Sequence, residues 1–159
     1  MIVRRAQWDD PVGVSLRAAQ RAELTVRYDD ANSEPGPAPT AADITVFLIA
    51  LDDDGFTPVA CGALRQIDDE HGELKRMFVI PERRGSGAAT LVLRALEQLA
   101  HDELGWSRLV LETGDRQPDA IRFYEREGYT RIPNFGHYAQ TPSSLCYERP
   151  LQAPLSEGV

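Results

Sequence analysis

The residues whose types and spacing best suit chemistry lie in one turn, Gly85-Ser86-Gly87, between an apolar run and an amphipathic helix. The first turn of a helix has backbone N–H groups without intrahelical partners and carries the positive end of the helix dipole. Glycines let the backbone approach an anion where a Cβ atom would collide with it. The stretch 73–103 therefore predicts a binding site for a phosphate-like anion.

Two common glycine motifs do not account for this turn. A P-loop needs a lysine directly after its last glycine, and no lysine follows here. The segment GSGAAT at 85–90 has the first two glycines of the dinucleotide-binding fingerprint, but Thr90 stands where the third is required. That fingerprint also belongs to a parallel βαβ unit, whereas the strand before this turn is expected to be the third of a meander. A nucleotide-binding protein is therefore the weaker interpretation.

The hydrophobic pattern of the whole chain predicts a mixed sheet with helices on its faces. We expect helices at 87–103 and 118–127, and a third at 11–27 whose loose pattern suggests a break. The turn at Asp54-Gly55 indicates a hairpin, and Gly62 within a strand indicates a bulge. The expected strands are 2–6, 44–51, 58–67, 73–80, 107–113, 128–132 and 145–151.

The stretch 28–43 holds three prolines and a glycine and few large apolar side chains, so we expect a loop. It is either an ordinary surface connection or a lid beside a substrate cleft, because long loops often carry function. The length of 159 residues suits one domain, expected at 2–151, followed by a tail at 152–159 that we expect to fray.

Composition excludes several classes of partner. A net charge of −8 argues against nucleic acid and is compatible with a cationic substrate, although solubility explains it more simply. No apolar stretch is long enough to cross a membrane, and the N-terminus lacks a signal-peptide pattern, so we expect a cytoplasmic protein. We expect Cys61 and Cys146 to be buried, reduced thiols, and no metal site, because no Cys/His cluster exists.

Two motifs together point to a known family. The hexapeptide RGSGAA at 84–89 fits the pattern R/Q-x-x-G-x-G/A. The later segment AIRFYEREGY fits A-x-x-x-Y-x-x-x-G-[FY] at Ala120, Tyr124, Gly128 and Tyr129. With these motifs, and with its order of elements over 2–151, the chain resembles the GNAT superfamily of acyl-CoA-dependent N-acyltransferases.

The resemblance implies an α/β (α+β mixed) fold with a mostly antiparallel sheet of about six to seven strands and helices on both faces. It also implies a V-shaped splay between the strand before the glycine turn and the next strand. Acetyl-CoA is the implied co-substrate, with its pyrophosphate at the helix start and its pantetheine arm along the splayed strand. The implied cofactor-binding residues are Met77, Phe78, Val79, Arg84, Gly85, Ser86, Gly87, Ala88, Ala89, Thr90, Gln117 and Asp119. The asparagine usual near the second motif is absent, and Gln117 is the candidate to replace it.

The resemblance also suggests catalytic roles. Tyr124 stands where family members place the tyrosine that gives a proton to the leaving thiolate, although a core aromatic is the commoner role for a tyrosine. Glu73 and Glu112 stand on strands where different members place a catalytic glutamate, so either could be the base. Each could instead be a solvated residue or an ion-pair partner of Arg76 or Arg108.

The implied function is transfer of an acetyl group from acetyl-CoA to a primary amine by direct attack through a tetrahedral intermediate. We expect a small-molecule or amino-acid acceptor, because the chain has no added recognition module. A protein N-terminal or lysine acetyltransferase, and a non-catalytic acyl-CoA-binding sensor or regulatory domain, stay open as alternatives. A homodimer stays open too, because dimers are common in the family.

Overall fold

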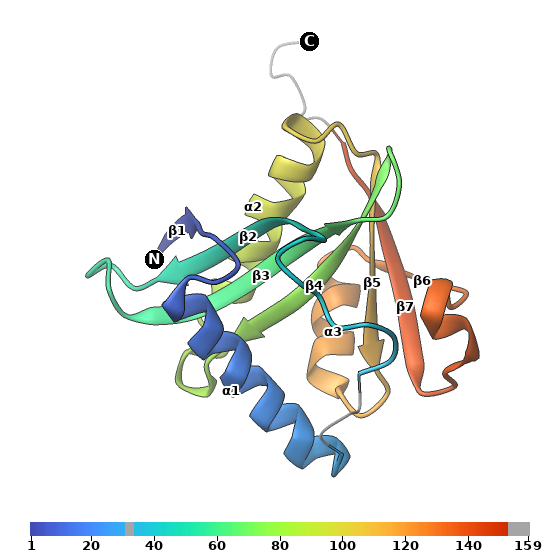
Figure 1. Ribbon diagram of the computed structural model, residues 1–159, viewed down its shortest axis with the longest axis horizontal. Coiled ribbons are helices and arrows are strands. Elements are labelled where there is room, and N and C mark those ends of the chain that lie inside the picture. Colours follow the sequence, from blue (N-terminus) through green and yellow to red (C-terminus); the bar gives the residue numbers. More distant parts are fainter. Residues whose placement is uncertain (31–33, 153–159) are drawn as a thin grey trace.

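The computed structural model describes residues 1–30 and 34–152, and in them seven strands form one sheet in the order β1-β2-β3-β4-β5-β7-β6 (Figure 1). Neighbouring strands are antiparallel except β4 and β5, which are parallel. This confirms the predicted mixed, mostly antiparallel sheet. The strands are β1 (Ile2–Arg5), β2 (Ile44–Leu51), β3 (Pro58–Gln66), β4 (His71–Val79), β5 (Arg108–Gly114), β6 (Thr130–Ile132) and β7 (Ser144–Pro150).

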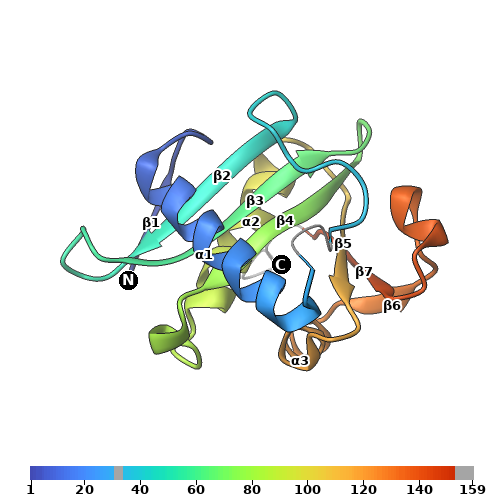
Figure 2. The same ribbon diagram turned by 60° about the horizontal axis from the view of Figure 1, so that its bottom comes forward.

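Helices cover both faces of the sheet, as the two views show (Figures 1 and 2). On one face, the apolar stripe of α2 (Ala88–Asp102) packs on one set of alternating strand residues, which includes Val46 and Leu48. On the other face, α1 (Pro11–Tyr28) buries Leu16 against Phe47 and the residues that alternate with it. A third helix, α3 (Pro118–Arg126), precedes β6, and short 3-10 turns occupy Pro81–Arg83 and Gly136–Gln140.

The helix α1 is continuous, so the expected break within 11–27 is wrong. Its start is well defined, because the Asp10 side chain accepts a hydrogen bond from Val12 N and Pro11 occupies the first turn. Only Gly13 and Leu16 are buried along it, which explains why its hydrophobic pattern is loose. A Cβ atom on Gly13 would lie 2.3 Å from Cε2 of Phe47, so glycine allows close packing there and does not break the helix.

The strands β4 and β5 pair over only three positions, from His71–Arg108 to Glu73–Val110. Both strands continue beyond these pairs, β4 to Val79 and β5 to Gly114, without further pairing between the two. The sheet therefore opens after Glu73, as the expected V-shaped splay requires, and the opening separates the last residues of the two strands.

A bulge lies where Gly62 indicated an irregularity, but the extra residue is on β4 and not on β3. The register shifts between Cys61 and Ala63, which pair with Phe78 and Lys75, so two residues of β4 face one of β3. Arg76, within the bulge, has a positive φ of 58°. Gly62 lets the side chain of Met77 in β4 lie against the backbone of β3, since a Cβ atom on Gly62 would lie 2.5 Å from Sδ of Met77.

The remaining expectations agree with the structure to within two residues at element ends. The largest differences are at β4, which begins at His71 and not at 73, and at β6, which begins at Thr130 and not at 128. Cys61 and Cys146 are buried free thiols, and burial raises the pKa of Cys61 to about 12. In the described part of the chain, no helix has both the length and the apolarity needed to cross a membrane. The single domain at 2–151 stays a prediction, and residues 153–159 of the expected frayed tail lie outside the described residues.

Candidate active site

A cavity of about 460 Å³ lies where the sheet opens, between β4, the glycine turn, α1 and α3. All the predicted cofactor-binding residues except Ser86 line it. The helix α1 adds side chains that no motif indicated, because they reach the cavity only through the packing of α1 against the splayed strand. These added residues are Gln20, Glu23, Leu24 and Arg27.

The glycine turn presents backbone N–H groups to this cavity. Gly85 and Gly87 have φ values of 77° and 88°, which favour glycine, and a Cβ atom on either would meet nothing within 4 Å. The first hydrogen bond of α2 runs from Leu91 N to Gly87 O, and no side chain caps this helix end. The N–H groups of the first turn therefore have no intrahelical acceptor and can hold an anion.

Arginines add positive charge around the same cavity, although the whole chain is acidic. The lining arginines are Arg27, Arg83, Arg84, Arg122 and Arg126, against the acids Glu23 and Asp119. Arg84 joins β4 to α1, because its Nε donates to the Val79 carbonyl at 3.2 Å and its Nη2 donates to Glu23 at 2.6 Å. The cavity thus combines an uncapped helix start with excess cationic side chains, which suits a polyphosphate ligand.

The strand edge expected to align a pantetheine arm already takes part in two hydrogen bonds. Gln20 Nε2 donates to the Met77 carbonyl at 3.0 Å, and Arg84 binds the Val79 carbonyl. Each carbonyl has a second lone pair, so both can still accept a bond from a ligand amide. Gln117, the candidate for the missing asparagine, lines the cavity and donates to the Tyr28 hydroxyl at 3.4 Å.

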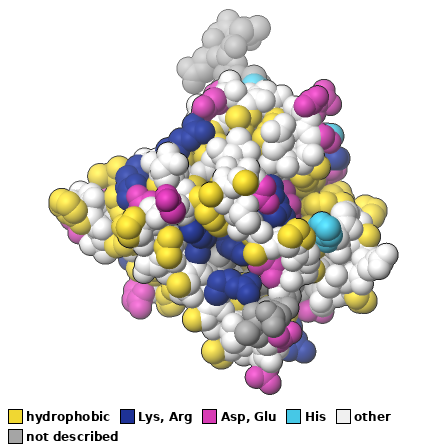
Figure 3. Space-filling model, in the orientation of Figure 1, with side chains coloured by type: hydrophobic (Ala, Val, Ile, Leu, Met, Phe, Trp, Pro, Cys, Tyr) yellow, Lys and Arg dark blue, Asp and Glu magenta, His cyan; other side chains and the backbone are white. Residues whose placement is uncertain are grey.

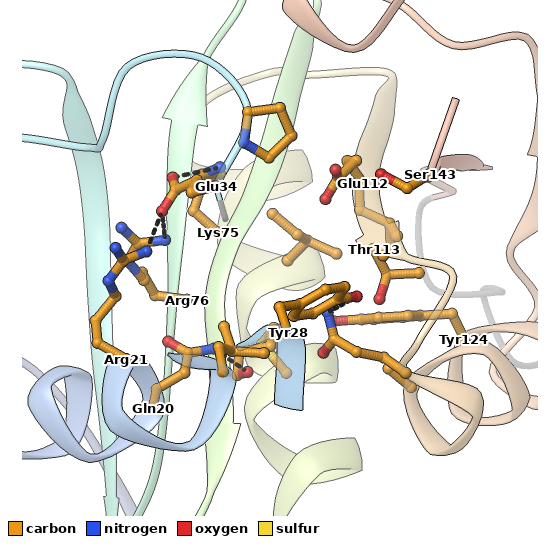
Figure 4. Close-up of a pocket in the computed structure, with 18 residues that line it drawn as sticks. Gln20, Arg21, Tyr28, Glu34, Lys75, Arg76, Glu112, Thr113, Tyr124 and Ser143 are labelled. Atoms are coloured by element: carbon orange, nitrogen blue, oxygen red, sulfur yellow. Dashed lines mark hydrogen bonds and ion pairs between the residues drawn. The ribbon is translucent and has the colours of Figure 1, made fainter. Parts of the chain in front are cut away.

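A second cavity, of about 170 Å³, lies deeper in the opening between β4 and β5 (Figure 4). Glu34 and Pro35, from the described part of the 28–43 stretch, contribute to its lining, so that part lies beside a cleft. The two cavities adjoin, because they share the lining residues Gln20, Leu24, Met77, Gln117, Ala120 and Tyr124.

Tyr124 lies where the two cavities meet. Its ring packs edge-on against Phe123 and Tyr129, with centroids 5.2 and 5.8 Å away, so its orientation is fixed. Burial raises the pKa of Tyr124, and the hydroxyl therefore keeps its proton at neutral pH. The side chain can act as a proton donor to a group that spans the junction of the cavities.

Glu112 of β5 lines the second cavity, on the wall opposite β4 (Figure 4). Ser144 Oγ donates to Glu112 Oε2 at 2.7 Å, which holds the carboxyl in place. Burial raises the pKa of Glu112, while the Ser144 hydrogen bond and the charge of Lys75 oppose this rise. A carboxyl with a raised pKa beside a small cavity is suited to accept a proton from a bound molecule.

Glu73 is in a different environment, although it is equally close to the splay. It occupies the last paired position of β4 and β5 and is not among the residues that line the second cavity. The Tyr138 hydroxyl donates to its Oε2 at 2.5 Å, and Arg65 binds its Oε1 at 3.2 Å. Its carboxylate thus joins β4 to β3 and to the segment before β7, whereas Glu112 faces the cavity.

The described residues contain no group of three or more His, Cys, Asp or Glu side chains that could hold a metal ion. The arrangement is that of an anion-binding cavity joined to a smaller polar cavity, with a tyrosine at the junction and a carboxyl in the smaller one.

Comparison with known proteins places this arrangement in a family. The model of the acetyltransferase (GNAT) family matches residues 7–129. Among curated proteins, the IAA acetyltransferase of Azospirillum brasilense is 42% identical over 97 residues, which are 60% of this chain and 62% of that protein. The chain therefore spans less than two thirds of that relative's length.

Solved structures agree in fold. A protein of Klebsiella pneumoniae subsp. pneumoniae MGH 78578, described as a candidate acyl-CoA N-acyltransferase, has a TM-score of 0.79 and 29% identity, covering 95% of this chain and 97% of its own. The PaiA N-acetyltransferase of Thermoplasma acidophilum, solved with coenzyme A, has a TM-score of 0.67 and 16% identity, covering 94% and 99%. The family match over most of the chain, together with the splayed sheet and the glycine turn, shows that the chain belongs to the GNAT family of acetyltransferases.

Proposed function

We propose that the protein is an acetyl-CoA-dependent N-acetyltransferase that acetylates the primary amine of a small molecule or an amino acid. The observation that carries the proposal is the position of Tyr124 at the junction of two cavities, one suited to a polyphosphate and one containing Glu112. A thioester that spans this junction would have its sulfur beside a proton donor and its carbonyl beside the smaller cavity.

The larger cavity fits coenzyme A in its chemistry. The N–H groups of the first turn of α2 and the surrounding arginines would take the pyrophosphate. The backbone of Met77, Phe78 and Val79 would align the amides of the pantetheine arm, with Gln117 as a further polar contact. Ser86 lies outside the cavity lining, so we assign it only a role in shaping the turn.

The smaller cavity would hold the acceptor amine. In the proposed reaction, Glu112 takes a proton from the amine, directly or through water, and the neutral nitrogen attacks the thioester carbonyl. A C–N bond forms, the tetrahedral intermediate collapses, and the C–S bond breaks. The departing thiolate takes the Tyr124 hydroxyl proton, and the second proton that the nitrogen loses as the amide forms returns to Tyr124 through water. The products are an N-acetylated amine and coenzyme A, and Glu112 releases its proton to solvent.

The geometry favours Glu112 over Glu73 as the base. Glu112 lines the acceptor cavity and has a raised pKa, so it exchanges protons nearer to neutral pH than an ordinary glutamate. Glu73 is bound by Tyr138 and Arg65, and we assign it the role of positioning these two side chains.

The test is a screen for coenzyme A release from acetyl-CoA with amino acids, polyamines, aminoglycosides and peptides as acceptors. We expect amine-dependent thiol release with at least one small acceptor. Acetylation of peptides alone would favour the protein acetyltransferase alternative. Coenzyme A binding without acetyl transfer to any acceptor would favour the sensor alternative and contradict the proposal.

A further inference from the structure

Three cationic side chains gather on one wall of the smaller cavity, around a single carboxylate (Figure 4). The space-filling view shows several Lys and Arg side chains close together near the centre of the face drawn in Figure 1 (Figure 3). Glu34 Oε2 lies 2.7 Å from Nη1 of Arg76 and 3.1 Å from Nη1 of Arg21, and Glu34 Oε1 lies 3.5 Å from Nζ of Lys75. The side chains of Lys75, Arg76 and Glu34 are only 10%, 12% and 14% exposed. This wall therefore already binds a carboxylate group in a sheltered position.

Among the described residues that line this cavity, cations outnumber acids by one. Among the described residues that line it, Arg21, Lys75 and Arg76 are cationic, and Glu34 and Glu112 are the acids. Glu112 lies on the opposite wall, where it would face the acceptor nitrogen (Figure 4). The Glu34 carboxylate thus contacts three cations, and Lys75 also donates to the Tyr138 hydroxyl at 3.2 Å and approaches Glu73 at 3.9 Å. The Arg76 guanidinium has five N–H donors, so it can bind a second carboxylate beside Glu34.

We propose that the acceptor is a small amine that also carries a carboxylate, with Lys75, Arg76 and Arg21 binding the carboxylate and Glu112 facing the amine. This inference rests on the proposed function and specifies the substrate class for the same site. A carboxylate is the appropriate anion, because the side chain of Glu34 shows that the wall accommodates that group. The cavity of about 170 Å³ has room for only a small group, which suits an acceptor whose amine and carboxylate lie close together.

The cationic wall argues against a polyamine or another purely cationic acceptor. The second ammonium group of such an acceptor would lie beside Lys75 and Arg76 in a sheltered space, where repulsion between like charges is weakly screened. The negative charge of the whole chain would favour cationic substrates at long range, but the lining of the cavity has the opposite preference.

The test compares free amino acids, including 4-aminobutanoate, with their carboxamides and their decarboxylated amines in the thiol-release assay. We expect kcat/KM for at least one amino acid to exceed that for its carboxamide by about tenfold or more, because hydrogen bonds to charged groups are worth that much. The replacement Arg76→Gln should reduce this ratio toward one, mainly by raising KM for the amino acid. Lys75→Gln serves as a second variant if Arg76→Gln does not fold.

The matched control is Arg5→Gln, which removes one ion-paired arginine that binds Glu103 at 3.0 Å and does not line either cavity. It should leave the ratio unchanged. Efficient acetylation of the carboxamides or the decarboxylated amines would overturn this inference and leave the proposed function intact. An unchanged ratio in both the Arg76 and the Lys75 variants would overturn the assignment of the cationic wall. Acetylation of no amine at all would overturn both proposals.

Discussion

The replacement Glu112→Gln separates the proposed base from the rest of the site. Glutamine has nearly the same shape, and its carbonyl can still accept the hydrogen bond that Ser144 Oγ donates at 2.7 Å. The change therefore removes the proton-accepting group and leaves the packing of β5 in place.

The expected loss of rate is large. General base catalysis contributes about 10²–10⁴-fold, so kcat/KM should fall by that factor, which corresponds to roughly 2.7–5.5 kcal/mol of transition-state stabilisation. In the wild type, kcat/KM should fall as the pH drops through the pKa of Glu112, which burial places above the usual 4.5. This acidic limb should be absent in the Glu112→Gln protein, because glutamine does not titrate.

The Glu112→Gln replacement should stabilise the folded protein, although it lowers the rate. The folded-state pKa of Glu112 is raised, so the folded protein binds more protons than the unfolded chain between the unfolded and folded pKa values. The free energy of unfolding therefore decreases as the pH rises through that window, and the cost persists at neutral pH. The Glu112→Gln protein should unfold at a higher temperature than the wild type at pH 7, as measured by circular dichroism.

The matched control is Glu73→Gln. It removes the buried charge that faces Arg65, so it should lower the unfolding temperature while retaining the acidic limb of the rate profile. Steady-state thiol release between pH 5 and 9 with a responsive amine measures both profiles. The reasoning is refuted if Glu112→Gln keeps near wild-type kcat/KM and its acidic limb, or if Glu73→Gln alone loses that limb.

Three further predictions concern the remaining parts of the site. Tyr124→Phe should lower kcat by about 10²-fold or more with little change in the Kd for acetyl-CoA; equal turnover in the two proteins would remove its role as proton donor. Gly87→Val places a side chain at a φ of 88° and should weaken coenzyme A binding about tenfold by calorimetry, whereas Gly105→Val, at a φ of 69° remote from the cavity, should not; similar effects would point to general strain. Gly62→Ala would place its Cβ 2.5 Å from Sδ of Met77 and should cost about 1–3 kcal/mol, a Tm decrease of roughly 2–12 °C; an unchanged Tm would show that Met77 adapts freely.

Much of the fold is predictable from the sequence because its signals are local. The run at 44–51 coincides with β2, and the glycine turn and the start of α2 lie where the motif indicated. The errors also have local causes. The break expected within 11–27 followed from a loose hydrophobic pattern, and the pattern is loose because only Gly13 and Leu16 of α1 are buried.

The site is less predictable, because its decisive features depend on long-range geometry. Glu73 and Glu112 are equivalent candidates in the sequence. The structure distinguishes them through the point at which β4 and β5 separate and through Tyr138 and Arg65, which bind Glu73. The cationic wall joins Arg21 of α1, Glu34 of a loop and two residues of β4, and no spacing in the sequence encodes that meeting. Arg76 also depends on the bulge for its orientation, and the sequence placed that bulge on the neighbouring strand.

The most direct test of acetyl transfer is a mass-spectrometric measurement of the product. The protein is incubated with acetyl-CoA labelled in the acetyl group and a mixture of small primary amines, and free coenzyme A is quantified in parallel. The account predicts a labelled N-acetyl product and one free coenzyme A for each molecule of it. Binding of acetyl-CoA, shown by calorimetry, with no labelled product from any amine would contradict the account.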